Sequence, residues 1–321
     1  MNGPIAVSVV VASHARHLRL RWLLNALEEQ TLEEPWEVVV VHDYDAPTAE
    51  RVLDGHPLAR AGRLRHQAIE PGTGSPARQR NIGWRAAGGE LIAFTDDDCR
   101  PEPAWLERLV AGARGAPGSV VQGAARPDPL EASILAAPHV RTLTIEPINR
   151  YAQAANILYP RALLERLGGF DERAVAGEDV DLALRAQAAG ASIAAAADAV
   201  VYHAVESHTL PGIVRQNLKW RYLAYLVKRH PEMRREMPLG VFWDREHVYT
   251  TLALLGVAGA LARPRLLALA VPYASRVLRR RSGGRRVPAL ALAEVPGQLV
   301  RQGAEVVGMV AGSVRHRTVL L

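Results

Sequence analysis

Cysteine and long apolar runs are both scarce in this sequence. The 321 residues include one cysteine, Cys99, so the chain can form neither an internal disulfide nor a thiolate zinc cluster. We therefore expect a cytoplasmic protein. The apolar run 5–12 is too short for a signal peptide or a membrane span, and it predicts a buried strand instead. With 22% charged residues and a mean hydropathy of −0.03, the chain is neither a polytopic membrane protein nor disordered.

The two ends of the sequence carry opposite net charge. Residues 1–200 contain 20 arginines and 26 acidic residues, a net charge of −6, whereas residues 201–321 contain 19 basic and 7 acidic residues, a net charge of +12. An acidic part with clustered carboxylates suits a divalent cation, and a basic part suits anionic lipid or nucleic acid. Neither a zinc finger nor an RNA-binding aromatic pattern is present, so we expect no nucleic-acid partner.

Three apolar segments end in polar residues. The pattern predicts three buried strands separated by helices: Val7–Val11, Val38–Val41 and Leu91–Thr95. This alternation predicts an α/β fold with a parallel sheet covered on both faces. Ligands of such sheets bind outside the carboxyl ends of the strands, so the site is expected at that edge.

The acidic triplet Asp96–Asp98 directly follows the third of these strands. Three adjacent carboxylates repel one another unless a cation or arginines neutralise them, which favours a Mg²⁺ or Mn²⁺ site that would also bridge diphosphate oxygens. The alternative is a solvated acidic turn in which Asp98 caps the segment near Pro101.

The next hundred residues give uneven signals. Between 120 and 160 the pattern is weak and interrupted by proline, which predicts loops and short strands. Residues 168–172 predict a turn, and residues 177–190 predict a helix that opens with acidic side chains. Helix capping alone could explain some of these acids, because negative charge is favourable at a helix N-terminus.

The C-terminal part predicts helices of a different kind. A helix is expected over 211–228, and the apolar stretches 250–261 and 266–273 follow, separated by Arg263, Pro264 and Arg265. Each stretch is shorter than the roughly 20 residues that span a bilayer. With the arginines between 276 and 286, they predict docking on an anionic membrane surface; the alternative is a helical subdomain packed on the core.

Several motifs in fixed order resemble one known family. Over residues 5–230 the chain resembles family 2 glycosyltransferases of the GT-A fold. The segments that carry this resemblance are Ser8–Arg16, Val40–Asp43, Pro76–Asn81, Asp96–Asp98, Gly168–Glu172 and Gly177–Leu182.

The resemblance implies an architecture. It implies a GT-A (Rossmann-like), mostly parallel sheet flanked by helices, with a C-terminal helical extension. The catalytic domain would cover residues 1–210, with a nucleotide-binding half at about 1–100 and an acceptor half at about 101–210. Residues 211–321 would form the helical, arginine-rich region, and we expect the protein in the cytoplasm or peripherally at the inner face of the membrane.

The resemblance also implies a donor pocket. In such a pocket Ser13 and Asp43 would line the base and ribose, Arg80 and Asn81 would face the base or the phosphates, and Asp96 would lie toward the ribose. The donor would be a UDP-, GDP- or dTDP-linked sugar. Because His42-Asp43-Tyr44 stands where family members often have two acids and a glycine, the usual uridine preference stays open.

By the same resemblance, Asp98, with Asp96 and His203, would hold the Mg²⁺ or Mn²⁺ ion. Asp179 would be the general base of an inverting transfer, with Glu178 beside it to orient the acceptor or cap the helix. The acceptor would be a glycan, a lipid-linked carrier or a small molecule. Residues 216–220 resemble a signature of processive synthases but have lysine in place of arginine, which favours a non-processive enzyme.

Two other functions remain open from the sequence. A nucleotidyltransferase shares the sheet and the paired carboxylates, but it normally has a glycine-rich loop early in the chain, and Ser13–Arg16 contains no glycine. A catalytically inactive GT-A protein that acts as a binding scaffold is the other alternative. A nucleotidyltransferase would release pyrophosphate, whereas a glycosyltransferase would release nucleoside diphosphate, so the product distinguishes these two enzymes.

Overall fold

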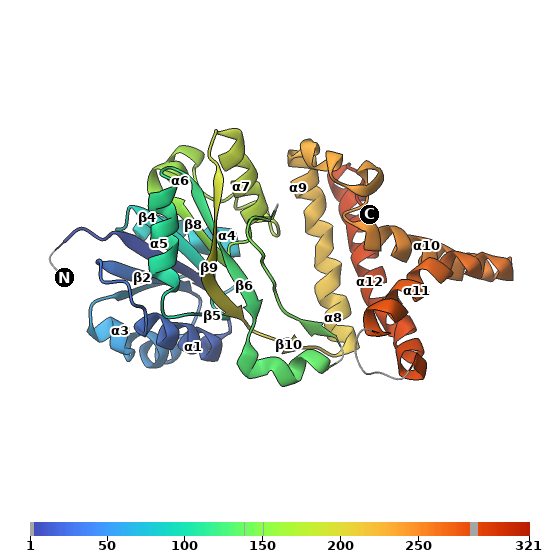
Figure 1. Ribbon diagram of the computed structural model, residues 1–321, viewed down its shortest axis with the longest axis horizontal. Coiled ribbons are helices and arrows are strands. Elements are labelled where there is room, and N and C mark those ends of the chain that lie inside the picture. Colours follow the sequence, from blue (N-terminus) through green and yellow to red (C-terminus); the bar gives the residue numbers. More distant parts are fainter. Residues whose placement is uncertain (1–2, 138, 150, 283–287) are drawn as a thin grey trace. The chain divides into compact units, whose positions relative to one another are not determined.

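The computed structural model describes residues 3–282 and 288–321 apart from residues 138 and 150. The chain divides into two compact units, Met1–Ser207 and His208–Leu321, which are described separately below (Figure 1). The predicted arginine-rich segment lies partly outside this description, since Arg285 and Arg286 belong to residues 283–287. No helix among the described residues is long and apolar enough to cross a membrane.

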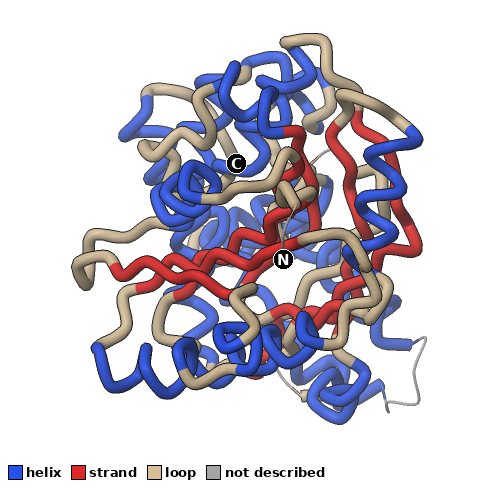
Figure 2. Tube along the Cα trace, turned by 90° about the vertical axis from the view of Figure 1, so that its left-hand side faces the viewer, coloured by secondary structure: helices blue, strands red, loops and turns tan. Residues whose placement is uncertain are grey.

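The first unit is built on an eight-stranded sheet with the order β3-β2-β1-β4-β8-β6-β9-β5. Figure 2 shows the strands in red and the helices in blue. Its strands are β1 Val7–Ser13, β2 Trp36–His42, β3 Leu64–Ala68, β4 Leu91–Asp96, β5 Cys99–Pro101, β6 Val120–Pro127, β8 Asn156–Pro160 and β9 Ile193–His203. A separate two-stranded sheet pairs β7 Val140–Arg141 with β10 Glu206–Ser207.

The half of the sheet that contains β3, β2, β1 and β4 is parallel throughout. All of β2 and all but one residue of β1 are buried, as expected for valine-rich strands covered on both faces. Val9 belongs to the core on the side of α1 and α5, and Val10 belongs to the core on the side of α4, α6 and α7. The predicted α/β fold with a mostly parallel sheet and a C-terminal helical extension is therefore confirmed.

Helices of the first unit fill the connections between these strands. They are α1 His17–Glu28, α2 Ala46–Ala49, the π-helical η1 Glu50–Asp54, α3 Pro57–Arg60, α4 Pro76–Ala86, α5 Trp105–Gly115, the 3-10 segment η2 Pro129–Ala136, α6 Arg161–Leu167 and α7 Glu178–Ala188. The N-terminus of α4 is stabilised by a cap: the Ser75 side chain accepts a hydrogen bond from the Arg78 amide, and Pro76 occupies the first turn.

The other half of the sheet is mixed, and the weak sequence pattern described it only in part. The predicted loops and short strands are present, the strands being β7 and β8, but β6 runs for eight residues, and β8 lies antiparallel between β4 and β6. The buried Asn156 side chain holds these strands by donating to the carbonyls of Ala124 and Ala199 at 2.7 Å. Gly123 leaves room for it, since a Cβ there would lie 2.3 Å from Asn156 Nδ2. A polar side chain in this role gives no hydrophobic periodicity.

The second unit is helical. It contains α8 Leu210–Asn217, η3 Leu218–Tyr222, α9 Leu223–Arg229, η4 Pro231–Arg235, η5 Pro238–Gly240, α10 Arg245–Ala260, η6 Pro264–Ala270, α11 Val271–Ser282 and α12 Pro288–His316. The helix predicted over 211–228 is thus interrupted by the 3-10 segment η3. The backbone of η3 lies so close to α12 that the contact requires a glycine: a Cβ at Gly312 would lie 2.1 Å from the carbonyl oxygen of Arg221.

Candidate active site

The polar residues that follow the parallel strands come together at one edge of the sheet. Strand pairing places Ser13 beside His42 and Ala12 beside Asp96. The predicted site at the carboxyl ends of the strands therefore has a structural basis, and it lies entirely within the first unit.

Arg80 joins two of the predicted carboxylates. This arginine comes from α4, is 6% exposed, and donates from Nη2 to Asp96 Oδ1 at 2.7 Å and from Nη1 to Glu178 Oε1 at 2.6 Å. Burial opposes the charge of the guanidinium, but Asp96 and Glu178 outweigh it, so the pKa of Arg80 is raised. The residue that was expected to face base or phosphates is therefore held between the acid at the end of β4 and the first acid of α7.

The acidic pair at the start of α7 is electrostatically unusual. Burial and the neighbouring Asp179 raise the pKa of Glu178 to about 7, against the opposing effect of Arg80. Burial also raises the pKa of Asp179, again opposed by Arg80. Asp179 is half-buried and accepts hydrogen bonds from the amides of Ala154 and Val180 at 3.1 and 2.9 Å. A carboxylate whose proton affinity is increased by burial suits a general base near neutral pH.

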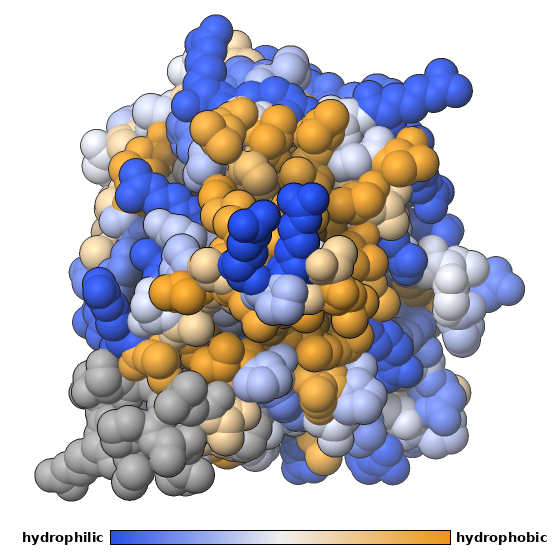
Figure 3. Space-filling model, turned by 90° about the vertical axis from the view of Figure 1, so that its right-hand side faces the viewer, coloured by the Kyte–Doolittle hydropathy of each residue, from blue (hydrophilic) through white to orange (hydrophobic). Residues whose placement is uncertain are grey.

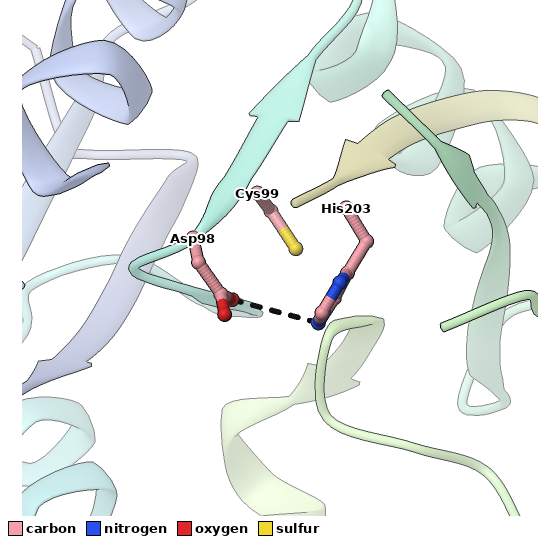
Figure 4. A group of neighbouring side chains, drawn as sticks. All are labelled: Asp98, Cys99 and His203. Carbon is pink, nitrogen blue, oxygen red and sulfur yellow. Dashed lines mark ion pairs between the residues drawn. The ribbon is translucent and has the colours of Figure 1, made fainter. Parts of the chain in front are cut away.

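Asp98, Cys99 and His203 form the group of side chains that could hold a metal ion within the described part of the chain (Figure 4). Pairing of β5 with β9 places Cys99 opposite His203. Asp98 Oδ2 accepts a hydrogen bond from Arg16 at 2.5 Å, whereas Asp98 Oδ1 is buried without a hydrogen-bond partner and lies 3.6 Å from His203 Nε2.

These three residues fit a divalent cation. His203 Nδ1 lies 2.9 Å from the Ala204 carbonyl and donates to it, so Nε2 is the nitrogen that faces Asp98 and that would bind a metal ion in the neutral imidazole. Two acceptors that face each other are stabilised by a cation between them. Burial raises the pKa of the Cys99 thiol well above its usual range, so a neutral sulfur lies beside a carboxylate and an imidazole. Hard cations such as Mg²⁺ prefer the oxygen of Asp98 to this sulfur.

Asp96, predicted as a further metal ligand, lies outside this group, and Arg80 binds one of its oxygens. Asp96 nonetheless lines the same pocket of about 220 Å³ as Asp98 and His203. Two cations that the sequence analysis gave no role also line it: Arg16, from the loop after β1, and Arg141, from β7. The complete lining is Arg16, Asp96, Asp98, Arg141, Thr142, Leu143, His203 and Glu206.

The middle acid of the triplet fixes the loops. Ser13 Oγ donates to Asp97 Oδ2 at 2.6 Å and lies 2.5 Å from the hydroxyl of Tyr44. Burial raises the pKa of Asp97 to about 6, although the hydrogen bond from Ser13 opposes this change. Tyr44 stacks on His42 with ring centroids 5.0 Å apart. Ser13, predicted in the nucleotide pocket, thus lies at the end of β1 and contacts side chains that follow β2 and β4.

The remaining two predicted donor residues lie in different surroundings. Asp43 Oδ2 is 2.5 Å from His14 Nδ1, so Asp43 lies at the strand ends. Asn81 is 1% exposed; its amide donates to the carbonyl of Phe170 and its carbonyl accepts from the Phe170 amide, both at 2.9 Å. The structure therefore brings Asn81 to the turn before α7 and away from the pocket. A Cβ at Gly169 would lie 2.4 Å from Asn81 Oδ1, which explains the glycine there.

The fold and this edge of the sheet define a GT-A type α/β protein. Residues 4–222 match the profile described as "Glycosyltransferase like family 2", and the chain belongs to this family. The match covers the whole first unit from its first strand onward.

Curated relatives agree with this assignment. The chain is 31% identical to the pre-mycofactocin glycosyltransferase of Mycobacterium tuberculosis over 173 residues, which are 50% of this chain and 37% of that protein. It is 26% identical to the glycosyltransferase AglE of Haloferax volcanii over 202 residues, 61% of this chain and 66% of AglE. The matched part thus spans little more than a third of the first relative's length.

Solved structures show the same fold. S. aureus TarS in complex with UDP-GlcNAc superposes with a TM-score of 0.54 at 18% identity, covering 98% of this chain and 93% of that one. The mannosyltransferase PcManGT from Pyrobaculum calidifontis, in complex with GDP-Man and Mn²⁺, gives a TM-score of 0.53 at 19% identity, covering 98% and 88%.

Proposed function

We propose that the protein is a metal-dependent, inverting and non-processive glycosyltransferase that moves a sugar from a nucleotide-sugar donor to a hydroxyl acceptor. One observation carries this proposal: Arg80 holds Asp96 and Glu178 on one buried guanidinium, so the strand-end acids and the acidic pair of α7 belong to one site. The catalytic domain would be residues 1–210, with the nucleotide-binding half before and the acceptor half after residue 100.

The donor would bind at the ends of β1, β2 and β4, where Ser13, Asp43 and Asp96 lie. Fold relatives have been solved with UDP-GlcNAc and with GDP-Man, which supports a UDP-, GDP- or dTDP-linked sugar. Arg16 and Arg141 line the pocket beside Asp98, so they add positive charge where a diphosphate would need it.

Asp98 and His203 would hold the Mg²⁺ or Mn²⁺ ion, with Asp96 on the donor side of the pocket. When bound, the ion would neutralise charge that develops on the departing nucleoside diphosphate. Support for this set comes from Asp98 Oδ1, which is buried without a hydrogen-bond partner, and from the orientation of His203 Nε2 toward it.

In the transfer, the acceptor oxygen would form a bond to the anomeric carbon while the bond from that carbon to the diphosphate oxygen breaks. Asp179 would take the hydroxyl proton, and the nucleoside diphosphate would leave with the bonding electrons. Attack opposite the leaving group inverts the anomeric configuration. Glu178, bound to Arg80, would keep Asp179 in place and raise its proton affinity by its charge.

The acceptor would be a glycan, a lipid-linked carrier or a small molecule. The curated relatives differ in this respect by name, since one acts on pre-mycofactocin, and the chain spans only part of each. We place the enzyme in the cytoplasm, where nucleotide sugars would be accessible.

A thermal-shift screen tests the proposal. The full chain is heated with UDP, GDP, dTDP, ADP or CDP, each with and without Mn²⁺, beside the variant Asp98→Asn. A nucleotide at 100 times its Kd should add about 2.7 kcal/mol to the free energy of unfolding. We expect one nucleotide to stabilise the wild type only with Mn²⁺, and the variant to lose this response.

Product analysis then separates the alternatives. Release of nucleoside diphosphate from the matching nucleotide sugar supports the transferase. Release of pyrophosphate from a nucleoside triphosphate would indicate a nucleotidyltransferase instead. Stabilisation without any turnover, across an acceptor panel, would indicate an inactive binding scaffold.

A further inference from the structure

Exposed aliphatic side chains gather on one hairpin of the second unit. In α10 and η6, Leu255 is 59% exposed, Leu261 95% and Leu267 49%, and Val271 at the start of α11 is 62% exposed. Figure 3 shows a broad hydrophobic area on the face where α10 and α11 lie, with strongly hydrophilic side chains within it. Single exposed leucines are ordinary, but a contiguous apolar surface of this kind indicates a binding surface.

The hairpin is well packed internally. Segment η6 folds back against α10 at two glycines: a Cβ at Gly256 would lie 2.8 Å from the Leu266 carbonyl oxygen, and one at Gly259 would lie 2.6 Å from Leu266 Cδ1. The Arg263 amide donates to the Gly259 carbonyl and the Leu266 amide donates to the Arg263 carbonyl, which closes the turn. Leu255, Leu261 and Leu267 therefore belong to an ordered element, which we call the α10–η6 hairpin (residues 245–270), and Val271 follows it directly.

Charge selects the kind of partner. Between Glu246 and Glu294 the sequence contains eight arginines and no acidic residue. Two of these arginines, Arg263 and Arg265, are exposed at the turn of the hairpin, next to Leu261. A second copy of this surface would bring like charges together, which is unfavourable. A surface that combines aliphatic side chains with the exposed Arg263 and Arg265 matches the boundary of an anionic bilayer, where phosphates lie above acyl chains.

We propose that the α10–η6 hairpin docks on an anionic membrane surface, with Leu261 and its aliphatic neighbours among the acyl chains and Arg263 and Arg265 at the phosphates. This inference is independent of the transferase proposal, because the binding needs neither donor nor acceptor. It adds a surface and a set of residues to the membrane partner that the sequence composition predicted.

Vesicle co-flotation of the full chain tests the docking. We expect binding to vesicles of phosphatidylcholine with phosphatidylglycerol, and much weaker binding to phosphatidylcholine alone. Leu261→Asp should weaken binding at least tenfold, because it removes a leucine that would lie among the acyl chains and brings a negative charge to the anionic surface. Leu239→Asp is the matched control: Leu239 is 83% exposed in the same unit but lies in η5, outside the hairpin. This control should bind as the wild type does.

The double variant Arg263→Gln/Arg265→Gln separates the electrostatic part. Each arginine near anionic lipid contributes about fivefold in affinity, so the pair should cost about 25-fold on anionic vesicles and little on neutral ones. All these side chains are exposed, so the thermal midpoints should match the wild type. Absence of wild-type binding, or equal loss in Leu261→Asp and Leu239→Asp, would overturn the proposal. Conversion of a dimer to a monomer by Leu261→Asp would show instead that a second copy covers the hairpin.

Discussion

The two units use arginine in opposite ways. In the first unit, Arg80 is buried and shared by two carboxylates, and its position sets the electrostatics of the acids around it. In the second unit, Arg263 and Arg265 are exposed beside exposed leucines. The net charge of each sequence half shows which sign dominates, but burial decides whether a charge tunes neighbouring groups or faces a partner.

Buried ionisable groups occur in both units, but in the first unit they lie in the proposed site and in the second they belong to the packing between helices. Glu178 and Asp179 of the first unit lie in the proposed site, and burial raises the pKa of each. His247 of the second unit lies between Asp244 and Glu305, at 2.9 and 3.2 Å, and belongs to the packing of α10 against α12. The comparison predicts that changes in the first group alter catalysis, whereas a change in the second alters stability.

The largest effect is expected for Asp179→Asn. Asparagine keeps the size of the side chain and an oxygen that can accept from the Ala154 amide, but it cannot take a proton from the acceptor. Loss of a general base lowers kcat by a factor of about 10² to 10⁴. Steady-state release of nucleoside diphosphate measures it. Asp198→Asn is the control, because that carboxylate is 72% exposed, and it should keep full activity. Equal activity of both variants would remove Asp179 from the mechanism.

Arg80→Met tests whether the buried charges of the first unit depend on one cation. Removing the guanidinium leaves Asp96 and Glu178 unpaired, which costs about 3–5 kcal/mol of unfolding free energy for a buried pair. Urea unfolding measures this loss. Arg78→Met in the same helix is the control, because Arg78 is exposed and its loss should change stability by less than about 0.5 kcal/mol. Adding Glu178→Gln to Arg80→Met should restore part of the stability. If Glu178→Gln instead lowers the unfolding free energy of Arg80→Met by a similar amount again, the interpretation that Arg80 neutralises both carboxylates would be wrong.

His247→Gln tests the second unit. The hydrogen bonds and charges of Asp244 and Glu305 outweigh burial and raise the pKa of His247 to about 9. Because the folded-state pKa exceeds the ordinary value of 6.5, protonated His247 stabilises the fold fully below pH 6.5, and this contribution is lost as the pH rises to 9. The difference is on the order of 3 kcal/mol. Thermal melts from pH 6 to 10 should show this loss in the wild type and not in the variant. Catalytic rates at pH 7 should stay comparable.

The sequence predicts the parallel half of the sheet better than the mixed half. The strands β1, β2 and β4 were predictable because each is a continuous apolar run that ends in polar residues, and parallel pairing then brings those residues together. The helix α4 was predictable from the Ser75-Pro76 start. The mixed half of the sheet was not, because its order depends on a buried Asn156 side chain that links β6, β8 and β9.

The site was also predictable only in part, because contacts between residues that are distant in sequence leave no local pattern. Asp98 and His203 are distant in sequence, and pairing of β5 with β9 brings them together; only the family resemblance indicated this. Arg16 and Arg141 gave no local signal, since an arginine in a loop or a short strand is ordinary and its role depends on the loop's path. Asn81 matches its motif, yet its contacts are with the turn at Phe170. The residue type alone does not distinguish a donor contact from a contact that holds a turn.

Glu178→Gln is the smallest and finest test of the comparison, because it alters the proton affinity of the acidic pair without breaking the site. Glutamine keeps the oxygen that accepts from Arg80 and removes one negative charge from beside Asp179. In the wild type, the coupled pair loses its last proton at about pH 7. Because the two carboxyl groups share that proton, Asp179 is fully ionised only above this pH, and kcat/KM should fall below it. Without the Glu178 charge, Asp179 ionises more readily, and this acidic limb should move to lower pH while the rate at pH 8 stays within about tenfold. A pH profile of kcat/KM measures both quantities. An unmoved limb would mean that Glu178 and Asp179 titrate independently, and that the buried charge at the start of α7, like that of His247, supports the fold and not the chemistry.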